Sequence, residues 1–201
     1  ALLVYISSYL KCHEPACFLA ALLNSQPLGF YGPAQLVQDA QRHGVAVHAV
    51  DVLHSEWDCT LEGNAVRLGL RLVGGLTKPV AQRITRQRLQ SPFTSTQDLA
   101  LRCQLDAGDL KALASADALR SLSGHRRQQV WDASALLPAP KLLQGVPIDE
   151  DELVLPAAGE GEEVTFDYAS VGLTLRSHPL LLLREQLSKK KLLTAAQMRD
   201  Y

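Results

Sequence analysis

The chain has 201 residues, of which 47% are hydrophobic and 20% charged, with a net charge of −1. This composition is typical of a globular protein and excludes a disordered chain, a collagen-like repeat and a disulfide-dense miniprotein. No apolar run approaches the roughly 20 residues that span a bilayer, so no membrane partner is expected. The first residues lack a charged leader and a cleavage site, so no signal peptide is predicted, and the start inside an apolar stretch suggests an excised fragment.

The small net charge conceals an alternation along the chain. Residues 1–63 sum to −4, residues 64–136 to +6 from eleven Lys and Arg against five Asp and Glu, residues 137–172 to −7, and residues 173–201 to +4. A basic middle between acidic flanks indicates an anionic partner for that middle segment. A merely solvated basic face fits the same counts, so charge alone leaves both interpretations open.

The N-terminal third reads as helices followed by a small β element. Residues 1–10 are expected to be a buried helix end. Pro15 fits the first turn of a helix that runs to about residue 23, because the first turn leaves its N–H groups unpaired. A second helix is predicted from Gly32-Pro33 to Gly44, which tolerates the left-handed conformation after a helix. The valine-rich residues 45–50 predict a short strand, with residues 60–62 as a possible edge.

The middle of the chain is predicted to be helical. From residue 65 the apolar spacing favours a helix that Gly74 and Gly75 end. Thr77 and Ser95 are placed to cap the next two helices, and Ser123 to cap the last one. These helices are expected over residues 77–90, 95–101, 105–114 and 123–131.

The C-terminal third begins with residues 137–165, which are rich in Pro, Gly and acidic residues and are interpreted as an extended linker. The acidic cluster at residues 149–152 is assigned to solvent rather than to a metal. Apolar patterning resumes over residues 166–201, where a helix is expected from Pro179 to Leu187 with its leucines on a core face.

No catalytic or metal-binding constellation emerges from the sequence. The four cysteines contain no C-x-x-C pair, so separate thiols in a reducing cytosol are preferred over a metal cluster at Cys12, His13 and Cys17. The six histidines are scattered, with no Ser or Cys partner at motif spacing. Structural or surface histidines are therefore the preferred interpretation.

Two segments share a helix, tight turn and helix plan: residues 68–84 and residues 110–130. The first resembles the helix-hairpin-helix pattern, with Gly75, Leu76, Ala81 and Ile84 at matching positions. It departs from the pattern at Thr77, which replaces the second glycine. In the second segment Asp117 stands where glycine is usual and adds a negative charge.

The physical basis of such a motif is simple. A glycine turn allows close approach of a DNA strand, and the amides of the turn and of the next helix point at a phosphate. Binding of this kind is independent of base sequence and sensitive to salt. Charge reversal at Lys78 together with Arg83 is expected to weaken it. The predicted DNA-binding residues are Gly74, Gly75, Leu76, Thr77, Lys78, Arg83, Arg126 and Arg127.

Several segments in order resemble the bacterial C-family DNA polymerases, the DNA polymerase III alpha-subunit type. The segment SYLKCHEPACFLAALLNSQPLGFYGPAQLVQDAQRHGV (residues 7–45) is similar to their distal fingers. Its part AALLNSQPLGFY, and HSEWDCTLE (residues 54–62), look most like the error-prone, damage-inducible branch. PFTSTQDLALRC and LKALASADAL resemble the tandem helix-hairpin-helix domain. DYASVGLTLRSHPLLLLR (residues 167–184) resembles the connection to an OB-fold domain.

The resemblance implies a mainly α fold with a small β element. It assigns residues 1–63 to the distal fingers, residues 64–136 to a tandem helix-hairpin-helix domain, residues 137–165 to the acidic linker, and residues 166–201 to the connection toward an OB fold.

The resemblance also implies a function. The parent enzyme would be a DNA-directed DNA polymerase acting in translesion synthesis and repair, with magnesium ions held by palm aspartates that this stretch lacks. The chain itself would then hold no catalytic residue, metal or cofactor. It would grip the double-stranded DNA backbone in the bacterial cytoplasm, attached to the rest of the polymerase chain. A sliding clamp or lesion-bypass protein is left open as a partner. A stand-alone DNA-binding adaptor and a protein-interaction module are the rival interpretations.

Overall fold

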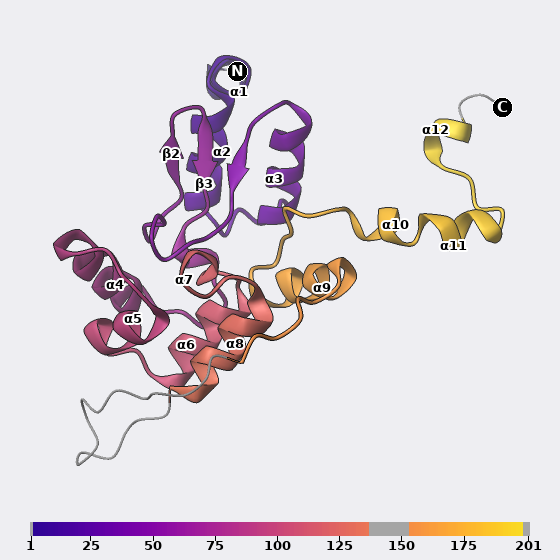
Figure 1. Ribbon diagram of the computed structural model, residues 1–201. Coiled ribbons are helices and arrows are strands. Elements are labelled where there is room, and N and C mark those ends of the chain that lie inside the picture. Colours follow the sequence, from indigo (N-terminus) through magenta and orange to yellow (C-terminus); the bar gives the residue numbers. More distant parts are fainter. Residues whose placement is uncertain (1, 137–152, 199–201) are drawn as a thin grey trace, which may run out of the picture.

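The computed structural model describes residues 2–136 and 153–198. Within these ranges the fold is mainly helical, with three short strands in one sheet, which confirms the predicted fold class. Figure 1 shows an upper lobe built from the first helices and the sheet, and a lower lobe of helices below it. The last helices leave these lobes as an extended arm.

The upper lobe starts with α1 (Leu2–His13), α2 (Pro15–Asn24) and α3 (Pro33–Arg42). The predicted bounds of α2 and α3 are confirmed, with Gly44 at a φ of 84° just after α3. The expectation that α1 is buried is wrong. None of its residues is buried, because it packs mainly against α2 and many of its apolar side chains are exposed.

The sheet contains β1 (Val47–His48), β2 (Thr60–Glu62) and β3 (Ala65–Arg67) in the order β1-β3-β2. Strand β3 pairs parallel with β1 and antiparallel with β2. The predicted edge at β2 is therefore confirmed. The helix predicted from residue 65 is wrong, because Val66 is fully buried between two strand partners, and only the short 3₁₀ helix η1 (Leu70–Leu72) precedes the glycines.

The lower lobe contains α4 (Lys78–Gln90), α5 (Thr96–Cys103), α6 (Ala107–Ser115), α7 (Arg120–Ser123) and α8 (Arg126–Ala135). Their apolar stripes meet in one core that includes Ile84, Leu99 and Leu113. Ser95 accepts a hydrogen bond from the Asp98 amide, as predicted for a cap. Ser123 does not cap α8; its hydroxyl bonds Thr96, and His125 is the cap.

Helix α9 (Glu160–Ser170) corrects the linker prediction. Residues 137–152 lie outside the described ranges, but residues 160–165 are helical rather than extended. Three glutamates in the first turn complement the positive end of the helix dipole, and Val164 is buried. The acidic composition that suggested a linker therefore belongs in part to a helix docked on the lower lobe, where α9 contacts α6.

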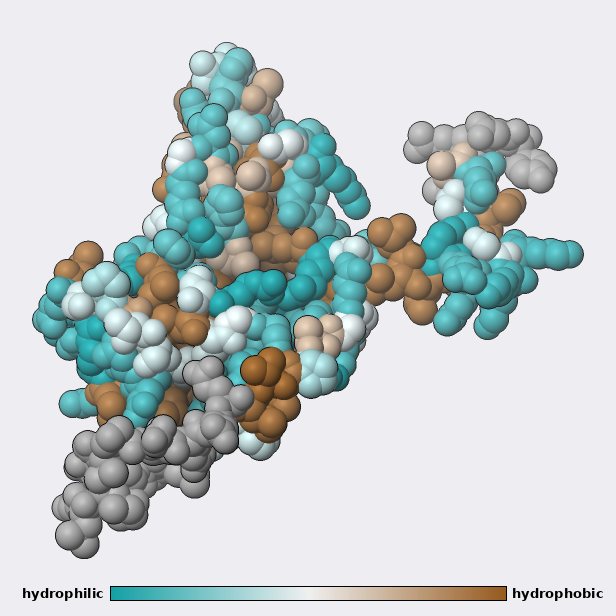
Figure 2. Space-filling model, in the orientation of Figure 1, coloured by the Kyte–Doolittle hydropathy of each residue, from teal (hydrophilic) through white to brown (hydrophobic). Residues whose placement is uncertain are grey.

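The arm consists of α10 (Pro179–Leu182), α11 (Arg184–Lys189) and α12 (Ala195–Met198). The helix predicted from Pro179 to Leu187 is thus divided in two. Leu180 to Leu183 are exposed rather than on a core face, and Figure 2 shows this apolar group on the arm. No helix in the described ranges has the length and apolar character needed to cross a membrane.

Candidate nucleic-acid interface

The first hairpin joins η1 to α4 through a turn at the surface. Gly75 adopts a φ of 85°, is exposed, and has open space where a Cβ would lie. Such a backbone conformation favours glycine over other residues. Leu76 is only 7% exposed and packs in the core, which anchors the turn from beneath. The turn is therefore fixed to the protein on one side and open to solvent on the other.

The amides around this turn form an unfilled set of donors. Among the described residues, no acceptor bonds the backbone N–H groups of Gly75, Thr77 or Lys78. Thr77 is the N-cap of α4, as predicted, but its side chain makes no capping hydrogen bond. Pro79 has no N–H, and the first bond of the helix runs from the Ala81 amide to the Thr77 carbonyl at 3.1 Å. Open amides at the positive end of a helix favour an anion.

Gly74, the other glycine of the turn, has a different role. Its amide donates to the carbonyl oxygen of Ser170 at the end of α9, at 2.8 Å. A Cβ at Gly74 would lie 3.0 Å from that oxygen. The residue thus serves the close docking of α9, and its amide is not open to a phosphate.

A cleft of about 620 Å³ opens beside the turn. Gly75 and Thr77 line one side, and Lys111 of α6 lines another. Asp106 and Asp109 also line it; they form a capping box at the start of α6, with Asp106 accepting from the Asp109 amide at 2.8 Å. Burial raises the pKa of Asp109. The cleft therefore brings one cation, Lys111, and two carboxylates together near the turn.

The second hairpin joins α6 to α7 at Asp117, which adopts a φ of 57° and is 8% exposed. Its carboxylate accepts hydrogen bonds from Gln129 at 2.6 Å and from Arg120 and Arg176 at 3.0 Å each. The negative charge that departs from the motif is therefore neutralised inside the protein. The Asp117 carboxylate therefore holds the turn to Gln129 of α8 and to Arg176.

Arg126, one of the predicted DNA-binding residues, is placed inside the protein by the structure. The side chain is buried, and it pairs with Glu163 at 2.8 Å and with Asp167, both on α9. Its Nε is buried without a partner among the described atoms. A guanidinium enclosed in this way is not available to a phosphate in this conformation. Arg127 lies nearer the surface and pairs with Glu162 at 2.7 Å.

Arg83, another predicted DNA-binding residue, is hydrogen-bonded within the protein. Its Nε donates to the carbonyl oxygen of Cys103 at 2.9 Å, which ties α4 to the end of α5. Lys78, in contrast, is exposed at the start of α4. Of the predicted side chains, Lys78 and Thr77 are thus the two that the structure leaves exposed beside the turn.

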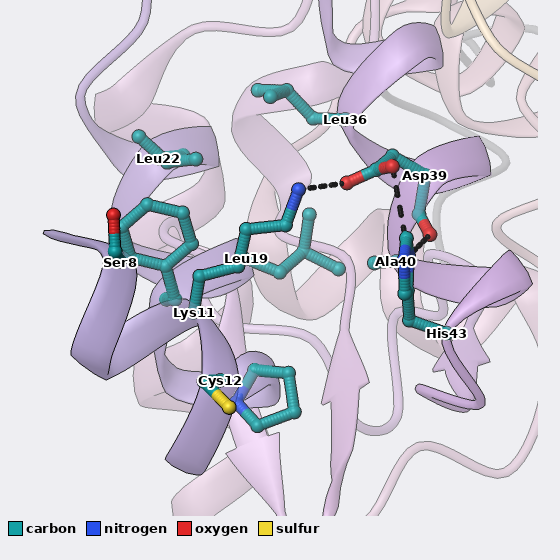
Figure 3. Close-up of a pocket in the computed structure, with 11 residues that line it drawn as sticks. Ser8, Lys11, Cys12, Leu19, Leu22, Leu36, Asp39, Ala40 and His43 are labelled. Carbon is teal, nitrogen blue, oxygen red and sulfur yellow. Dashed lines mark hydrogen bonds and ion pairs between the residues drawn. The ribbon is translucent and has the colours of Figure 1, made fainter.

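A second cleft, of about 510 Å³, lies between α1, α2 and α3 (Figure 3). Lys11 reaches across it to Asp39 at 2.7 Å, and His43 also faces that carboxylate at 3.6 Å. The hydrogen bond from Lys11 lowers the pKa of Asp39. The cleft is otherwise apolar, with Leu19 and Leu36 among its lining residues. The Asp39 carboxylate is thus bonded to side chains of the protein itself.

Within the described ranges, no group of three His, Cys, Asp or Glu side chains is arranged to hold a metal ion. Asp117, Glu163 and Asp167, the acidic residues that do cluster, are already bonded to Arg126 and Arg176. These donors do not fit the magnesium ions of polymerase chemistry. The acidic residues 149–152 lie outside the described ranges.

Comparison with known proteins agrees with this geometry. A helix-hairpin-helix motif model matches residues 44–129, which include both hairpins. The error-prone DNA polymerase of Aromatoleum aromaticum is 51% identical over 210 residues, and that of Bordetella parapertussis is 54% identical over 208; both matches cover the whole chain and 20% of the relative. The corresponding protein of Methylococcus capsulatus is 50% identical over 97% of this chain and 21% of its own length.

The chain is therefore a mainly helical protein with a helix-hairpin-helix domain. The chain belongs to the family of error-prone DNA polymerases, which are C-family polymerases. It spans about one fifth of the length of the curated relatives that it matches.

Proposed function

We propose that the chain is a non-catalytic part of an error-prone DNA polymerase that grips duplex DNA by its backbone, without base specificity. The observation that supports this most directly is the first hairpin. Its turn at Gly75 faces solvent, and the amides of Gly75, Thr77 and Lys78 have no acceptor among the described residues. Donors of this kind suit a phosphate oxygen and carry no information about the base.

In this proposal the parent enzyme adds nucleotides to a primer, using magnesium ions held outside the residues described here. The chain contributes by holding the duplex, and by joining the distal fingers (residues 1–63) to an OB-fold domain through residues 166–201. The names of the relatives support a role in error-prone synthesis, and hence in lesion bypass and repair. The bacterial cytoplasm is the corresponding location. A sliding clamp or a lesion-bypass accessory protein is a further partner in this proposal.

A titration of the 201-residue chain with labelled duplexes of unrelated sequence tests the proposal. We expect similar affinity for each duplex, and a steep loss of affinity between two salt concentrations, since phosphate contacts release counterions. Lys78→Glu should weaken binding. The double reversal with Arg83 is less clean, because Arg83 also bonds Cys103. Binding that is weak and insensitive to salt would instead favour a protein-interaction module.

A further inference from the structure

The basic middle segment owes its +6 charge to eleven Lys and Arg, and the structure sorts these into two groups. Eight bond to acceptors of the protein itself: Arg67, Arg71, Arg83, Arg88, Arg102, Arg120, Arg126 and Arg127. The other three are Lys78, Arg86 and Lys111, which are exposed and have no hydrogen-bond or ion-pair partner among the described residues.

These three cations lie around the first hairpin. Lys78 opens α4 directly after the turn. Lys111 lines the cleft beside Gly75 and Thr77 from α6. Arg86 follows Lys78 by eight residues, which places it about 12 Å further along α4 and about 80° around the axis, on the exposed side of the helix.

The second hairpin offers a different surface. Arg120 faces Asp117, Arg126 faces Glu163 and Asp167, and Arg127 faces Glu162. A phosphate approaching these arginines meets the carboxylate of Asp117 or those of α9 as well, so attraction and repulsion largely cancel. Binding there would require an ion pair to break and its carboxylate to be left without a partner. Asp117 and helix α9 together thus neutralise the second hairpin.

We propose that the DNA backbone follows one track, from Lys111 past the turn at Gly75 and along α4 to Arg86, and that the second hairpin makes no phosphate contact. This rests on the proposed function and adds the path and its residues. The distance from Lys78 to Arg86 corresponds to about three or four phosphates of one strand, at 3.4 Å of helix axis for each.

Two carboxylates limit where the phosphate lies. Asp106 and Asp109 line the same cleft as Lys111, so its interior is unfavourable for an anion. The phosphate is therefore placed at the rim formed by Thr77 and Lys78, where the open amides lie. Removal of one negative charge by Asp109→Asn should tighten DNA binding.

The test compares charge-neutralising variants in two matched pairs. Lys111→Gln and Arg86→Gln remove unpaired cations; Arg120→Gln and Arg127→Gln remove the same charge from ion-paired positions. Affinity for a labelled duplex is measured by fluorescence anisotropy at several salt concentrations, and circular dichroism checks that each variant is folded. We expect Lys111→Gln and Arg86→Gln to bind several-fold more weakly. Each should also lower the slope of log affinity against log salt by about 0.9. The two control variants should bind nearly as the parent chain does.

Losses in Arg120→Gln or Arg127→Gln as large as those in Lys111→Gln would overturn the single track. Unchanged binding in both Lys111→Gln and Arg86→Gln would also overturn it, and if Lys78→Glu still weakened binding, the proposed function would stand without the track. A parent chain that does not bind duplex DNA would instead remove the proposed function itself.

Discussion

The amide of Gly74 donates to the carbonyl oxygen of Ser170 at 2.8 Å, which joins the first hairpin to the end of α9. At its other side α9 pairs with Arg126 through Glu163 and Asp167. The acidic helix α9 therefore contacts both hairpins. It bonds the first one, whose turn at Gly75 has open amides, and it pairs with an arginine of the second one. The two hairpins are therefore linked to each other through α9.

Crowding at Gly74 gives a first prediction. Gly74→Ala should destabilise the fold by about 1–3 kcal/mol, because the new Cβ would lie 3.0 Å from the Ser170 oxygen. Gly161→Ala, inside α9 itself, is the matched control: its Cβ would meet only Leu182 at 3.9 Å, and it should stabilise the helix by about 0.5–1 kcal/mol. Urea unfolding measures both. Equal effects of the two substitutions would contradict the docking role of Gly74.

The buried ion pairs of Arg126 give a second prediction. Arg126→Met should cost about 3–5 kcal/mol, since it leaves the Glu163 and Asp167 carboxylates with less compensation in a buried setting. Arg127→Gln, which removes only a partly exposed pair with Glu162, should cost less than about 1 kcal/mol. Thermal or urea unfolding of the two variants distinguishes them. A small loss in Arg126→Met would show that α9 is not held by these charges.

Asp117→Gly, which restores the usual glycine of the motif, gives a third prediction. The change relieves a positive φ but removes the acceptor of Gln129, Arg120 and Arg176, so stability should fall and DNA affinity should not rise. Gln104→Gly is the control, because Gln104 has a φ of 50° and is exposed at the end of α5. That variant should keep or slightly raise stability. A gain in DNA affinity for Asp117→Gly would return the second hairpin to the binding surface.

The buried thiols give a prediction about pH. Burial raises the pKa of Cys103 from 9.0 to about 11 and also raises that of Cys59. The fold therefore favours the protonated thiols, and this stabilising effect is complete below the ordinary thiol pKa of 9.0, which holds in the unfolded chain. As pH rises from there toward 11, the unfolded chain loses these protons first, so the free energy of unfolding decreases. Urea unfolding at about pH 8, below this window, and at about pH 10, half-way through it, measures the effect. In Cys103→Ala the decrease should be smaller.

The same burial predicts the reactivity of the four cysteines. Cys12 and Cys17 are exposed, whereas Cys59 and Cys103 are buried. A thiol reagent should therefore modify the first two rapidly in the folded chain and the other two only after denaturation. Rapid reaction of Cys103 in the folded chain would show that the core around it opens easily.

Helices whose ends are marked by a proline or a glycine could be predicted from the sequence. Helix α2 begins at a proline and α3 is followed by Gly44, and both were placed correctly from these residues. Strand β3 was missed although its antiparallel partner β2 directly precedes it, separated only by Gly63 and Asn64. A two-residue loop that contains glycine is a hairpin signal, and it was available in the sequence. Only the parallel partner β1 lies further away along the chain. Helix α9 was missed because its first-turn glutamates resemble a solvated acidic linker, while the buried partner Arg126 lies far away in sequence.

The candidate site divides in the same way. The turn at Gly75 was predicted from the glycine and the following helix, and it lies at the surface as a positive-φ glycine. Arg126 was misassigned, since a charge count does not reveal which cations already have a carboxylate partner. Lys111 was not singled out, because its proximity to the first turn arises only when α6 packs beside it. Whether a basic residue is available to an anion thus depends more on its lack of a partner within the protein than on its position in a motif.

The most direct test of the central claim compares Gly75→Ala with Gly44→Ala. Both glycines have a φ near 85° and open space for a Cβ, so both variants bear a similar backbone strain. Duplex affinity of the folded variants is measured at one salt concentration. If the Gly75 turn holds a phosphate, Gly75→Ala should lose about tenfold or more in affinity, because the added methyl group blocks the close approach of a DNA strand, while Gly44→Ala should bind like the parent chain. Equal affinity of the two variants would contradict the account.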